Sequence, residues 1–444
     1  MRSSSVAVVL FTQDLRLHDN PVLHAAVSAA EQVVPLFVVD PAVGRAGFAA
    51  ANRVAFLAEC LAGLDAGLRR VGSRLTVRHG DPAEQVARVV AEVGAGGVHV
   101  AAGVSGYAQR REARLRAVFG ERLHVHEASL TVVPAGQVTP AGRDHYAVFT
   151  PYYQAWLRAP RRTVHRAPRA LRTPEGIGSD PLPVARPDSP GLPPGGEGAA
   201  RAQWRGWDVD GYAQQHDDLA ADGTSRLSPY LHFGCLSPSE LAARVQGREG
   251  DGAQAFLRQL AWRDFHHQVL AARPDAARQD YRPRGDRWHR DEREARAWRE
   301  GRTGYPIVDA GMRQLAHEGW MHNRARLITA SFLAKSLYLD WRTGARHFLS
   351  LLVDGDVADN QLNWQWVAGT GTDTRPNRVL NPLRQADRYD PDGAYVRRWV
   401  PELAHVPGPA VHRPWLLAPD YPEPIIDPGE LGTRFRHGRA LDAP

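Results

Sequence analysis

The sequence predicts an α/β protein in which a doubly wound parallel sheet is followed by a domain made only of helices. Short, continuous apolar runs alternate with amphipathic segments over residues 1–130, a pattern typical of buried parallel strands joined by helices. Proline and glycine are concentrated in residues 168–198, as in a connector. From Trp204 onward the apolar residues recur only with helical spacing. We therefore expect an α/β domain at 1–130, a connector at 131–200 and a helical domain at 201–444.

The predicted sheet is built from apolar runs that are too short for helices. The first helix is expected to be capped by the segment Asp19-Asn20-Pro21, a typical helix start. We expect this helix to run through Ala30. The other helices of this half are expected at 52–70 and 82–93, and the strands at 6–11, 33–39, 75–78, 97–101 and 123–126.

The second half shows clear helical signals. A helix start is predicted at Ser237, where a serine N-cap is followed by Pro238 and Glu240. Apolar residues between Phe256 and Val269 fall on one helical face. Longer helices are expected at 312–335 and 341–353.

The charge balance favours a partner that carries phosphate. Lys and Arg together number 55, against 49 Asp and Glu, which gives a net charge of +6, and Lys335 is the only lysine. Arginine binds phosphate through two parallel hydrogen bonds, although a coding bias toward arginine would give the same excess. Charge alone therefore leaves nucleic-acid contact open.

Cysteine and apolar content exclude other classes of protein. Cys60 and Cys235 are the only cysteines, too few for a disulfide framework, a structural zinc site or an iron–sulfur cluster. No metal site is expected. No stretch approaches the roughly 18 apolar residues of a membrane span. We therefore expect a soluble protein of the cytoplasm.

The segment from Thr224 to Pro229 allows two interpretations. Three hydroxyls and Arg226 precede a helix, so the hydroxyls, backbone N–H groups and helix N-terminus can together bind a phosphate. In the alternative, the segment is a plain cap with Ser228 at the N-cap and Pro229 at the first helical position. Spacing alone favours the cap.

The acidic segment 354–360 resembles the start of a calcium loop but fails its pattern. Ala358 holds the fifth position, and Asp359 holds the sixth, where glycine is required. The carboxylates therefore need another partner, such as an arginine or a polar heterocycle, or they lie in a solvated turn as helix caps.

Twelve tryptophans are an unusual number, because each indole N–H needs a partner when buried. Trp364 and Trp366 would point about 200° apart on a helix and should meet different environments. Trp262, beside Arg263, suits stacking on a base with a charge nearby. Core packing is the default explanation for any one of these rings.

Together these segments resemble the photolyase/cryptochrome family, most closely the bacterial class I cyclobutane pyrimidine dimer photolyases. The resemblance covers most of the chain with the family's order and spacing. The matching stretches are FTQDLRLHDNP (11–21), TSRLSPYLHFGCLSP (224–238), LAWRDF (260–265), GYPIVDAGMRQLAHEGWMHNRARLITASFL (304–333), DWRTGARHF (340–348), DGDVADNQLNWQW (354–366) and RRWVPEL (397–403).

The resemblance implies an N-terminal antenna domain, a connector and a helical domain that binds FAD, in agreement with the fold expected above. It implies that Arg326 and Asp354 pair beside the flavin ring and that Asn360 faces flavin N5. The other implied flavin-binding residues are Tyr212, Thr224, Ser225, Arg226, Leu227, Ser228, Phe256, Gln259, Arg263, Asn323 and Asp356.

The resemblance also implies light-driven repair of cyclobutane pyrimidine dimers in UV-damaged DNA, a carbon–carbon lyase reaction. Excited reduced FAD (FADH⁻) would donate an electron to the dimer and later recover it. Photolyases are among the enzymes known to flip their target out of the duplex, so flipping is implied here too. Trp364, Trp341 and Trp288 match the family's electron chain. The residues implied to contact the dimer or DNA are Trp262, Trp366, Arg324, Leu327 and Arg378.

Two positions depart from the family pattern. Gln259 stands where glutamate is usual, and Leu327 stands where methionine is usual. An amide has no acidic proton to give to the dimer, so slower repair is expected. The (6-4) photolyases place histidine at the positions of Asn323 and Leu327, and neither is histidine here.

Two other functions remain open. A cryptochrome-like FAD photoreceptor with weak or no repair is favoured by Gln259 and opposed by the two clamp tryptophans. A general nucleic-acid-binding module explains the arginines but no flavin site. For the antenna we expect an 8-hydroxy-deazaflavin over folate, because the Asn-Glu pair of folate-binding relatives is missing near Arg110 and Arg111. We expect a monomer.

Overall fold

The structure is a computed structural model that describes residues 6–440, and these residues form two compact units. Unit 1 comprises the chain up to Pro187 together with 193–207 and 225–274, and unit 2 comprises 188–192, 208–224 and the chain from Asp275 onward. Residues 225–274, expected in the helical domain from their place in the sequence, pack with the N-terminal unit, since α11 (Asp251–Ala272) contacts α6 (Phe149–Arg158).

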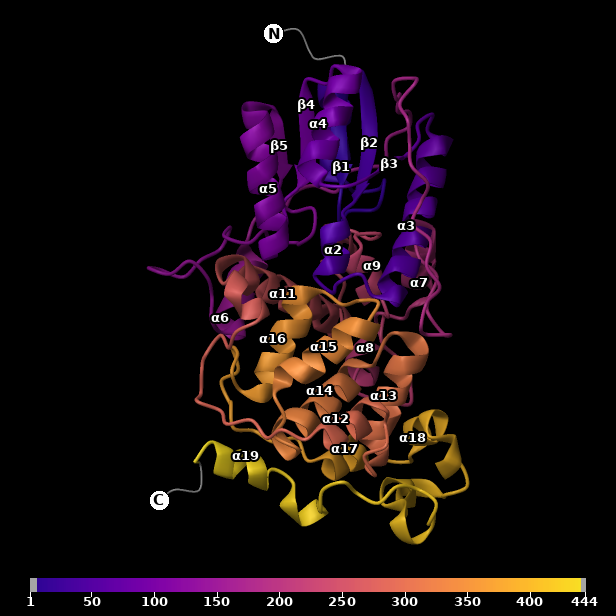
Figure 1. Ribbon diagram of the computed structural model, residues 1–444, viewed down its shortest axis with the longest axis vertical. Coiled ribbons are helices and arrows are strands. Elements are labelled where there is room, and N and C mark those ends of the chain that lie inside the picture. Colours follow the sequence, from indigo (N-terminus) through magenta and orange to yellow (C-terminus); the bar gives the residue numbers. More distant parts are fainter. Residues whose placement is uncertain (1–5, 441–444) are drawn as a thin grey trace. The chain divides into compact units, whose positions relative to one another are not determined.

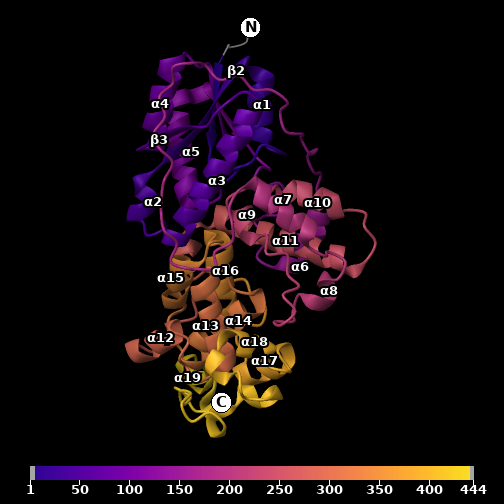
Figure 2. The ribbon, with the colours of Figure 1, turned by 90° about the vertical axis from the view of Figure 1, so that its right-hand side faces the viewer.

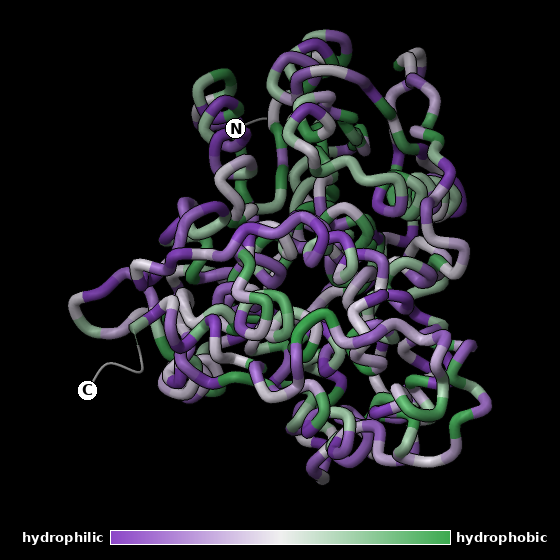
Figure 3. The backbone as a smooth tube through the Cα atoms, turned by 60° about the horizontal axis from the view of Figure 1, so that its bottom comes forward, coloured by the Kyte–Doolittle hydropathy of each residue, from purple (hydrophilic) through white to green (hydrophobic). Residues whose placement is uncertain are grey.

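Unit 1 contains the predicted parallel sheet. Its five strands lie in the order β3-β2-β1-β4-β5 and all neighbours are parallel. β1 is buried along its whole length, which explains why its sequence is apolar without alternation, and the tube that follows the N-terminal trace is accordingly green in Figure 3. The bounds are β1 (Val6–Phe11), β2 (Gln32–Val39), β3 (Thr76–His79), β4 (Gly97–Ala101) and β5 (Leu123–His126) (Figure 1).

Helices cover both faces of this sheet, and α1 and α4 lie on opposite sides of it in Figure 2. The predicted cap segment 19–21 is confirmed: Asn20 is the N-cap of α1, and its side chain accepts a hydrogen bond from Leu23 N. The helices of unit 1 are α1 (Pro21–Ala29), α2 (Pro41–Arg45), α3 (Ala51–Arg70), α4 (Pro82–Val93), α5 (Gly106–Phe119), α6, α7 (Glu197–Gly206), α9 (Ser228–His232), α10 (Pro238–Val245) and α11.

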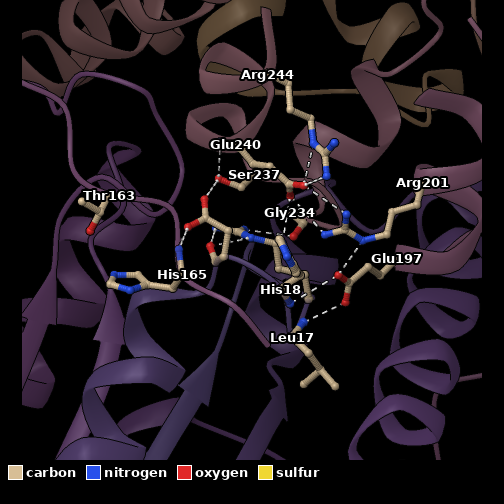
Figure 4. A network of polar contacts seen from close by, with 12 residues as sticks. Leu17, His18, Thr163, His165, Glu197, Arg201, Gly234, Ser237, Glu240 and Arg244 are labelled. Carbon is tan, nitrogen blue, oxygen red and sulfur yellow. Dashed lines mark hydrogen bonds and ion pairs between the residues drawn. The ribbon is translucent and has the colours of Figure 1, made fainter. Parts of the chain in front are cut away.

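A buried polar network joins the loop after β1 to the start of α10 (Figure 4). Asp19 is fully buried; its carboxylate accepts hydrogen bonds from Arg162, with Nη2–Oδ2 at 2.8 Å, and from the Ser237 hydroxyl. Ser237 also caps α10, as predicted, by accepting from Glu240 N at 3.2 Å. Because these groups are far apart in the sequence, the network fixes the loop against α10.

Glu240 anchors the other half of the network. Its buried carboxylate accepts from Arg201 Nη1 at 3.1 Å and from Arg244 Nε at 2.9 Å. Arg201 Nε also donates to Glu197 Oε1 at 3.0 Å, and Glu197 Oε2 accepts from Leu17 N at 2.8 Å. The charges thus compensate one another, as a buried carboxylate requires.

Unit 2 is helical, and one predicted helix is wrong. The segment 312–335 contains a break: α13 (Pro306–Glu318) ends at Gly319, which adopts the left-handed conformation (φ 61°), and α14 (Asn323–Ser331) begins after it. The remaining helices are α8 (Tyr212–Gln215), α12 (Glu292–Arg299), α15 (Trp341–Leu351), α16 (Val357–Ala368), α17 (Pro382–Tyr389), α18 (Ala394–Trp399) and α19 (Thr433–Gly438). Between residues 6 and 440, none of the helices has the length and apolar character needed to cross a membrane.

The only lysine of the chain is buried in unit 2. Lys335 lies in a π-helical turn (Phe332–Ser336) that continues α14. Its ammonium donates to Pro376 O at 2.5 Å and lies 3.7 Å from the centre of the Phe435 ring. Burial, together with the nearby Arg439, lowers the pKa of Lys335 to about 7.

The polar network predicts acid sensitivity. Burial alone would raise the pKa of Glu240 and of Asp19, but the hydrogen bonds and charges of Arg201 and Arg162 lower both overall. A carboxyl whose folded-state pKa lies below its unfolded value stabilises the fold above the unfolded pKa, and this stability is lost as pH falls through the folded pKa. We expect the urea midpoint of the chain to fall between about pH 5 and pH 3.

The variant Glu240→Gln should show a smaller acid-induced decrease than the wild type, because one titrating group is removed. Glu112→Gln, in the exposed pair with Arg116, serves as the control and should titrate like the wild type. An unchanged decrease in Glu240→Gln would contradict the assignment.

Candidate functional site

The predicted site residues divide between the two units, and each group is described within its own unit. Unit 1 holds Ser225, Arg226, Leu227, Ser228, Phe256, Gln259, Trp262 and Arg263. Unit 2 holds Tyr212, Thr224, Trp288, Asn323, Arg324, Arg326, Leu327, Trp341, Asp354, Asp356, Asn360, Trp364, Trp366 and Arg378.

In unit 1 the segment before α9 differs from the predicted cap. Leu227, not Ser228, occupies the N-cap position, and Ser228 is the first helical residue. The reason lies one residue earlier, because Arg226 adopts a positive φ of 51° and turns the chain before the helix. The Ser225 hydroxyl accepts from Leu227 N at 3.4 Å. The cap interpretation with Ser228 is therefore wrong.

α11 carries the other predicted residues of unit 1. Phe256 is buried against Trp204 and Trp207, with ring centroids 5.6 and 5.0 Å apart. Arg263 donates to the carbonyl of Leu130. Gln259 is exposed, so its amide is open to a ligand.

Trp262, the first predicted clamp ring, has one face covered. Phe149 stacks on it with centroids 3.6 Å apart and planes 4° apart. The indole is half-buried. A base can therefore stack only on the face opposite Phe149, and Phe149 holds the ring in place for that contact.

In unit 2 the predicted pair of Arg326 and Asp354 is present. Arg326 Nη2 donates to Asp354 Oδ2 at 2.7 Å, and the Asp354 side chain is 2% exposed. Asp354 Oδ1 is buried and has no hydrogen-bond partner. The hydroxyl of Thr224, in the same unit, is also buried without a partner. Buried polar atoms are rarely left unpaired. These two oxygens therefore fit a polar ligand such as the implied flavin.

Asp356 and Asn360, in the rest of the acidic segment, make hydrogen bonds at the start of α16. Asp356 is the N-cap of α16, where Oδ1 accepts from Ala358 N at 2.8 Å and from Asp359 N at 3.1 Å. Asn360, one turn later, donates from Nδ2 to Ala345 O at 3.2 Å. Asp354 thus has the arginine partner and Asp356 is a helix cap, but both residues are buried, so the expectation of a solvated turn is wrong.

The three tryptophans of the predicted electron chain occupy different depths. Trp364 is 2% exposed, and its Nε1 is buried without a hydrogen-bond partner. Trp341 is fully buried and donates from Nε1 to Asp280 Oδ1 at 2.9 Å. Trp288 is half-buried and contacts the ring of Tyr338, with centroids 4.9 Å apart. The set therefore includes buried and partly exposed rings.

Gly344 sets how closely Trp364 approaches α15. A Cβ on Gly344 would lie 2.1 Å from Cη2 of the Trp364 ring, far inside van der Waals contact. Gly344 is three residues after Trp341, so it lies on the same helical face. The missing side chain thus brings the Trp364 ring onto the helix face that carries Trp341, and α15 and α16 lie side by side in both ribbon views.

The predicted DNA-contacting residues of unit 2 have protein partners. Arg324 Nη2 donates to Asp217 Oδ1 at 2.6 Å and its guanidinium lies 4.3 Å from the centre of the Tyr389 ring. The guanidinium of Arg378 lies 5.4 Å from the centre of the Trp366 ring. Trp366 and Leu327 are both half-buried, so the two tryptophans of α16 do meet different environments.

Sequence reasoning missed several partners of these residues. Asp217, Tyr338 and Gly344 were not singled out. Only Gly344 had a signal in the sequence: a glycine inside an amphipathic helix weakens it unless close packing requires one. The contacts of Asp217 with Arg324 and of Tyr338 with Trp288 join residues that are distant in the sequence, so only the folded structure shows them.

Gly344→Ala should destabilise the protein by about 1–3 kcal/mol, because the new methyl group overpacks against the Trp364 ring. The control is Gly198→Ala in α7, where a Cβ would meet nothing within 4 Å. That variant should be neutral or slightly more stable. Urea unfolding measures both, and equal midpoints would contradict the close contact at Gly344.

Known families, relatives and a solved structure resemble this chain over most of its length. The DNA photolyase family model matches residues 7–174, and the model for the FAD binding domain of DNA photolyase matches residues 256–438. The chain is 60% identical over 454 residues to the deoxyribodipyrimidine photo-lyase of Streptomyces griseus, with 99% of this chain and 100% of the relative covered. It is 37% identical to that of Escherichia coli, with 95% of each chain covered. The crystal structure of a class III photolyase from Agrobacterium tumefaciens matches with a TM-score of 0.92 and 30% identity, covering 99% of this chain and 98% of the other. The chain therefore belongs to the DNA photolyase family.

Proposed function

We propose that this chain is a deoxyribodipyrimidine photo-lyase, which repairs cyclobutane pyrimidine dimers in damaged DNA with light. The observation that carries the proposal is the buried carboxylate of Asp354, paired with Arg326 and left with one oxygen free of any partner. A family in which this segment binds FAD gives that oxygen a ligand. Membership of the family gives the ligand its reaction.

Residues of each unit are proposed to bind FAD. Ser225, Arg226, Leu227, Ser228 and Tyr212 are proposed for the phosphates and ribose, with the Thr224 hydroxyl. Phe256, Gln259, Arg263, Asn323, Arg326, Asp354, Asp356 and Asn360 are proposed to line the rest. When bound and reduced, FAD supplies the light-excited electron that opens the dimer and accepts it back.

The protein's part is to hold charge near the ring. Arg326 pairs with the buried Asp354 and aligns it, and the Asn360 side chain is proposed to offer an amide to the ring. An amide stabilises a neutral or anionic ring by hydrogen bonding without a fixed charge.

Trp364, Trp341 and Trp288 are proposed to carry electrons from the surface toward the flavin. Electron tunnelling decays steeply with distance, so short hops between indoles are needed. Asp280 stabilises an oxidised Trp341 through its hydrogen bond and negative charge. The half-buried Trp288 is the end at which electrons enter.

Trp262 and Gln259, in unit 1, and Trp366 and Leu327, in unit 2, are each proposed to contact the dimer. Arg324 and Arg378 are proposed for the flanking phosphates. Arg324 shares its charge with Asp217, so its contribution to DNA affinity depends on that partner. Gln259 can hydrogen-bond the pyrimidine but cannot protonate it.

For the antenna domain we propose an 8-hydroxy-deazaflavin. In a doubly wound sheet, ligands bind outside the carboxyl ends of strands where the order reverses, here β1 and β4. Arg111, in α5, has a buried Nε without a hydrogen-bond partner. Its guanidinium carbon lies 5.7 Å from the centre of the Tyr107 ring. A flat chromophore with an acceptor oxygen suits this pair.

Three further expectations belong to this proposal. The chain acts as a monomer. It acts in the cytoplasm, where its DNA substrate lies in the bacteria to which its relatives belong. Its domains run from 1–130 and 201–444 with the connector 131–200 between them, even though packing groups part of the second range with unit 1.

A cryptochrome-like photoreceptor with weak or no repair is the second candidate. One observation favours it: Gln259 is exposed and offers an amide where the repair enzymes of this class have a carboxyl. The retained rings at Trp262 and Trp366 favour repair.

Repair of a dimer-bearing oligonucleotide under blue light, by protein with reduced FAD, tests the proposal. We expect repair by the wild type, no repair in the dark, and a severalfold higher yield per absorbed photon in Gln259→Glu, because a carboxyl can supply a proton. If neither protein repairs the dimer while both bind FAD, the photoreceptor function is favoured instead.

Trp364→Phe should abolish light-driven reduction of oxidised FAD while the urea midpoint changes little, because phenylalanine keeps the packing but is much harder to oxidise. Absorbance of the flavin under illumination measures the effect. Trp399→Phe is the matched control, because Trp399 is half-buried and is not one of the three tryptophans of the proposed electron path. This variant should reduce FAD like the wild type. Unchanged photoreduction in Trp364→Phe would exclude the electron path.

A further inference from the structure

Tyr338 lies against the outer end of the proposed electron path. Its ring centroid is 4.9 Å from that of Trp288, with the planes inclined by 42°. The backbones are also joined, because His289 N donates to Tyr338 O at 2.8 Å. Tyr338 adopts a positive φ of 55°, which is costly for an aromatic residue and is retained only where the surroundings hold it.

The surroundings do hold this ring in one place. Tyr338 is 2% exposed. A Cβ on Gly438, in α19, would lie 2.1 Å from the Tyr338 ring, so only glycine permits the approach. Phe435, in the same helix, packs edge-on against Tyr338, with the ring centroids 6.0 Å apart. The ring is therefore fixed beside Trp288 and shielded from solvent.

The phenol also has a base to accept its proton. Tyr338 Oη donates to Asp286 Oδ1 at 2.9 Å. The Asp286 side chain is 2% exposed and is held by Arg439, with Nε–Oδ1 and Nη2–Oδ2 both at 2.6 Å. Such a bidentate pair fixes the orientation of the carboxylate through two charge-assisted hydrogen bonds. Burial, with the bond to Asp286, raises the pKa of Tyr338, so the phenol is protonated at neutral pH.

We propose that Tyr338 is a fourth electron donor in this chain, which reduces oxidised Trp288 and passes its proton to Asp286. The inference rests on the proposed function, which generates the oxidised Trp288. One electron moves from the Tyr338 ring to the Trp288 radical cation. The O–H bond of Tyr338 breaks and its proton goes to Asp286 Oδ1. The products are neutral Trp288, a neutral tyrosyl radical and a protonated Asp286.

Charge balance favours this step. An oxidised phenol is a strong acid, so its proton leaves as the electron leaves, and the positive charge no longer remains on Trp288. Protonated Asp286 pairs less strongly with Arg439, but Arg439 Nη2 also donates to Ala368 O at 2.9 Å. The guanidinium thus keeps an acceptor. Return of the transferred electron to Trp288 is prevented because Trp288 is already neutral.

The test is flash photolysis of the full chain reconstituted with oxidised FAD, read by transient absorption and by electron paramagnetic resonance. In the wild type we expect a tryptophan radical that converts into a tyrosyl radical, identified by spectral narrowing when ring-deuterated tyrosine is incorporated. The conversion should slow in D₂O, because a proton moves with the electron. In Tyr338→Phe the tyrosyl signal should be lost and the tryptophan radical should decay by electron return.

Tyr421→Phe is the matched control. Tyr421 is also buried and donates from its hydroxyl to a buried carboxylate, Asp309, but between residues 6 and 440 it has no ring contact with Trp288, Trp341 or Trp364. This variant should form the tyrosyl radical like the wild type. A tryptophan radical that decays identically in the wild type and Tyr338→Phe, without a tyrosyl signal, overturns the inference. Absence of any radical overturns the proposed electron path itself.

Discussion

The ion pair of Arg326 and Asp354 is the interaction on which the arrangement of unit 2 depends. It ties α14, which carries four of the proposed site residues, to the loop that leads into α16. Removal of a charge from water costs several kcal/mol, and a buried carboxylate is tolerated only with an aligned partner. Because one oxygen of Asp354 still lacks a partner, the pair is incomplete without a ligand. The same contact thus joins α14 to the loop before α16 and belongs to the proposed flavin site.

The proposed electron path adds a second constraint, which concerns the distance between rings and not their charge. Neighbouring rings must be close, so helices that carry them must approach closely as well. Gly344 lets the Trp364 ring lie on α15, and Gly438 lets α19 lie on Tyr338. In both places a missing Cβ makes the approach possible. Small residues therefore matter as much here as the tryptophans.

Sequence reasoning reached much of the fold and part of the site. The apolar runs gave the five strands, Asn20 and Ser237 are the caps expected of them, and Asp354 has the arginine that the family resemblance implied. The break within the predicted helix 312–335 was missed, because Gly319 is only one unfavourable residue in a strong apolar pattern. The partners of Arg324 and Trp288 were missed because Asp217 and Tyr338 lie 107 and 50 residues away along the chain, and local patterns contain no information about such pairing.

The burial of Lys335 has a consequence for the surface of the protein. Since the chain has no other lysine, every positive side chain outside the core is a guanidinium or an imidazole. A guanidinium stays protonated throughout the physiological pH range and is not a target of lysine acetylation or ubiquitination. The attraction of this surface for a polyanion is therefore insensitive to acylation in the cell, and amine-reactive dyes or crosslinkers find no side chain to modify on the folded surface.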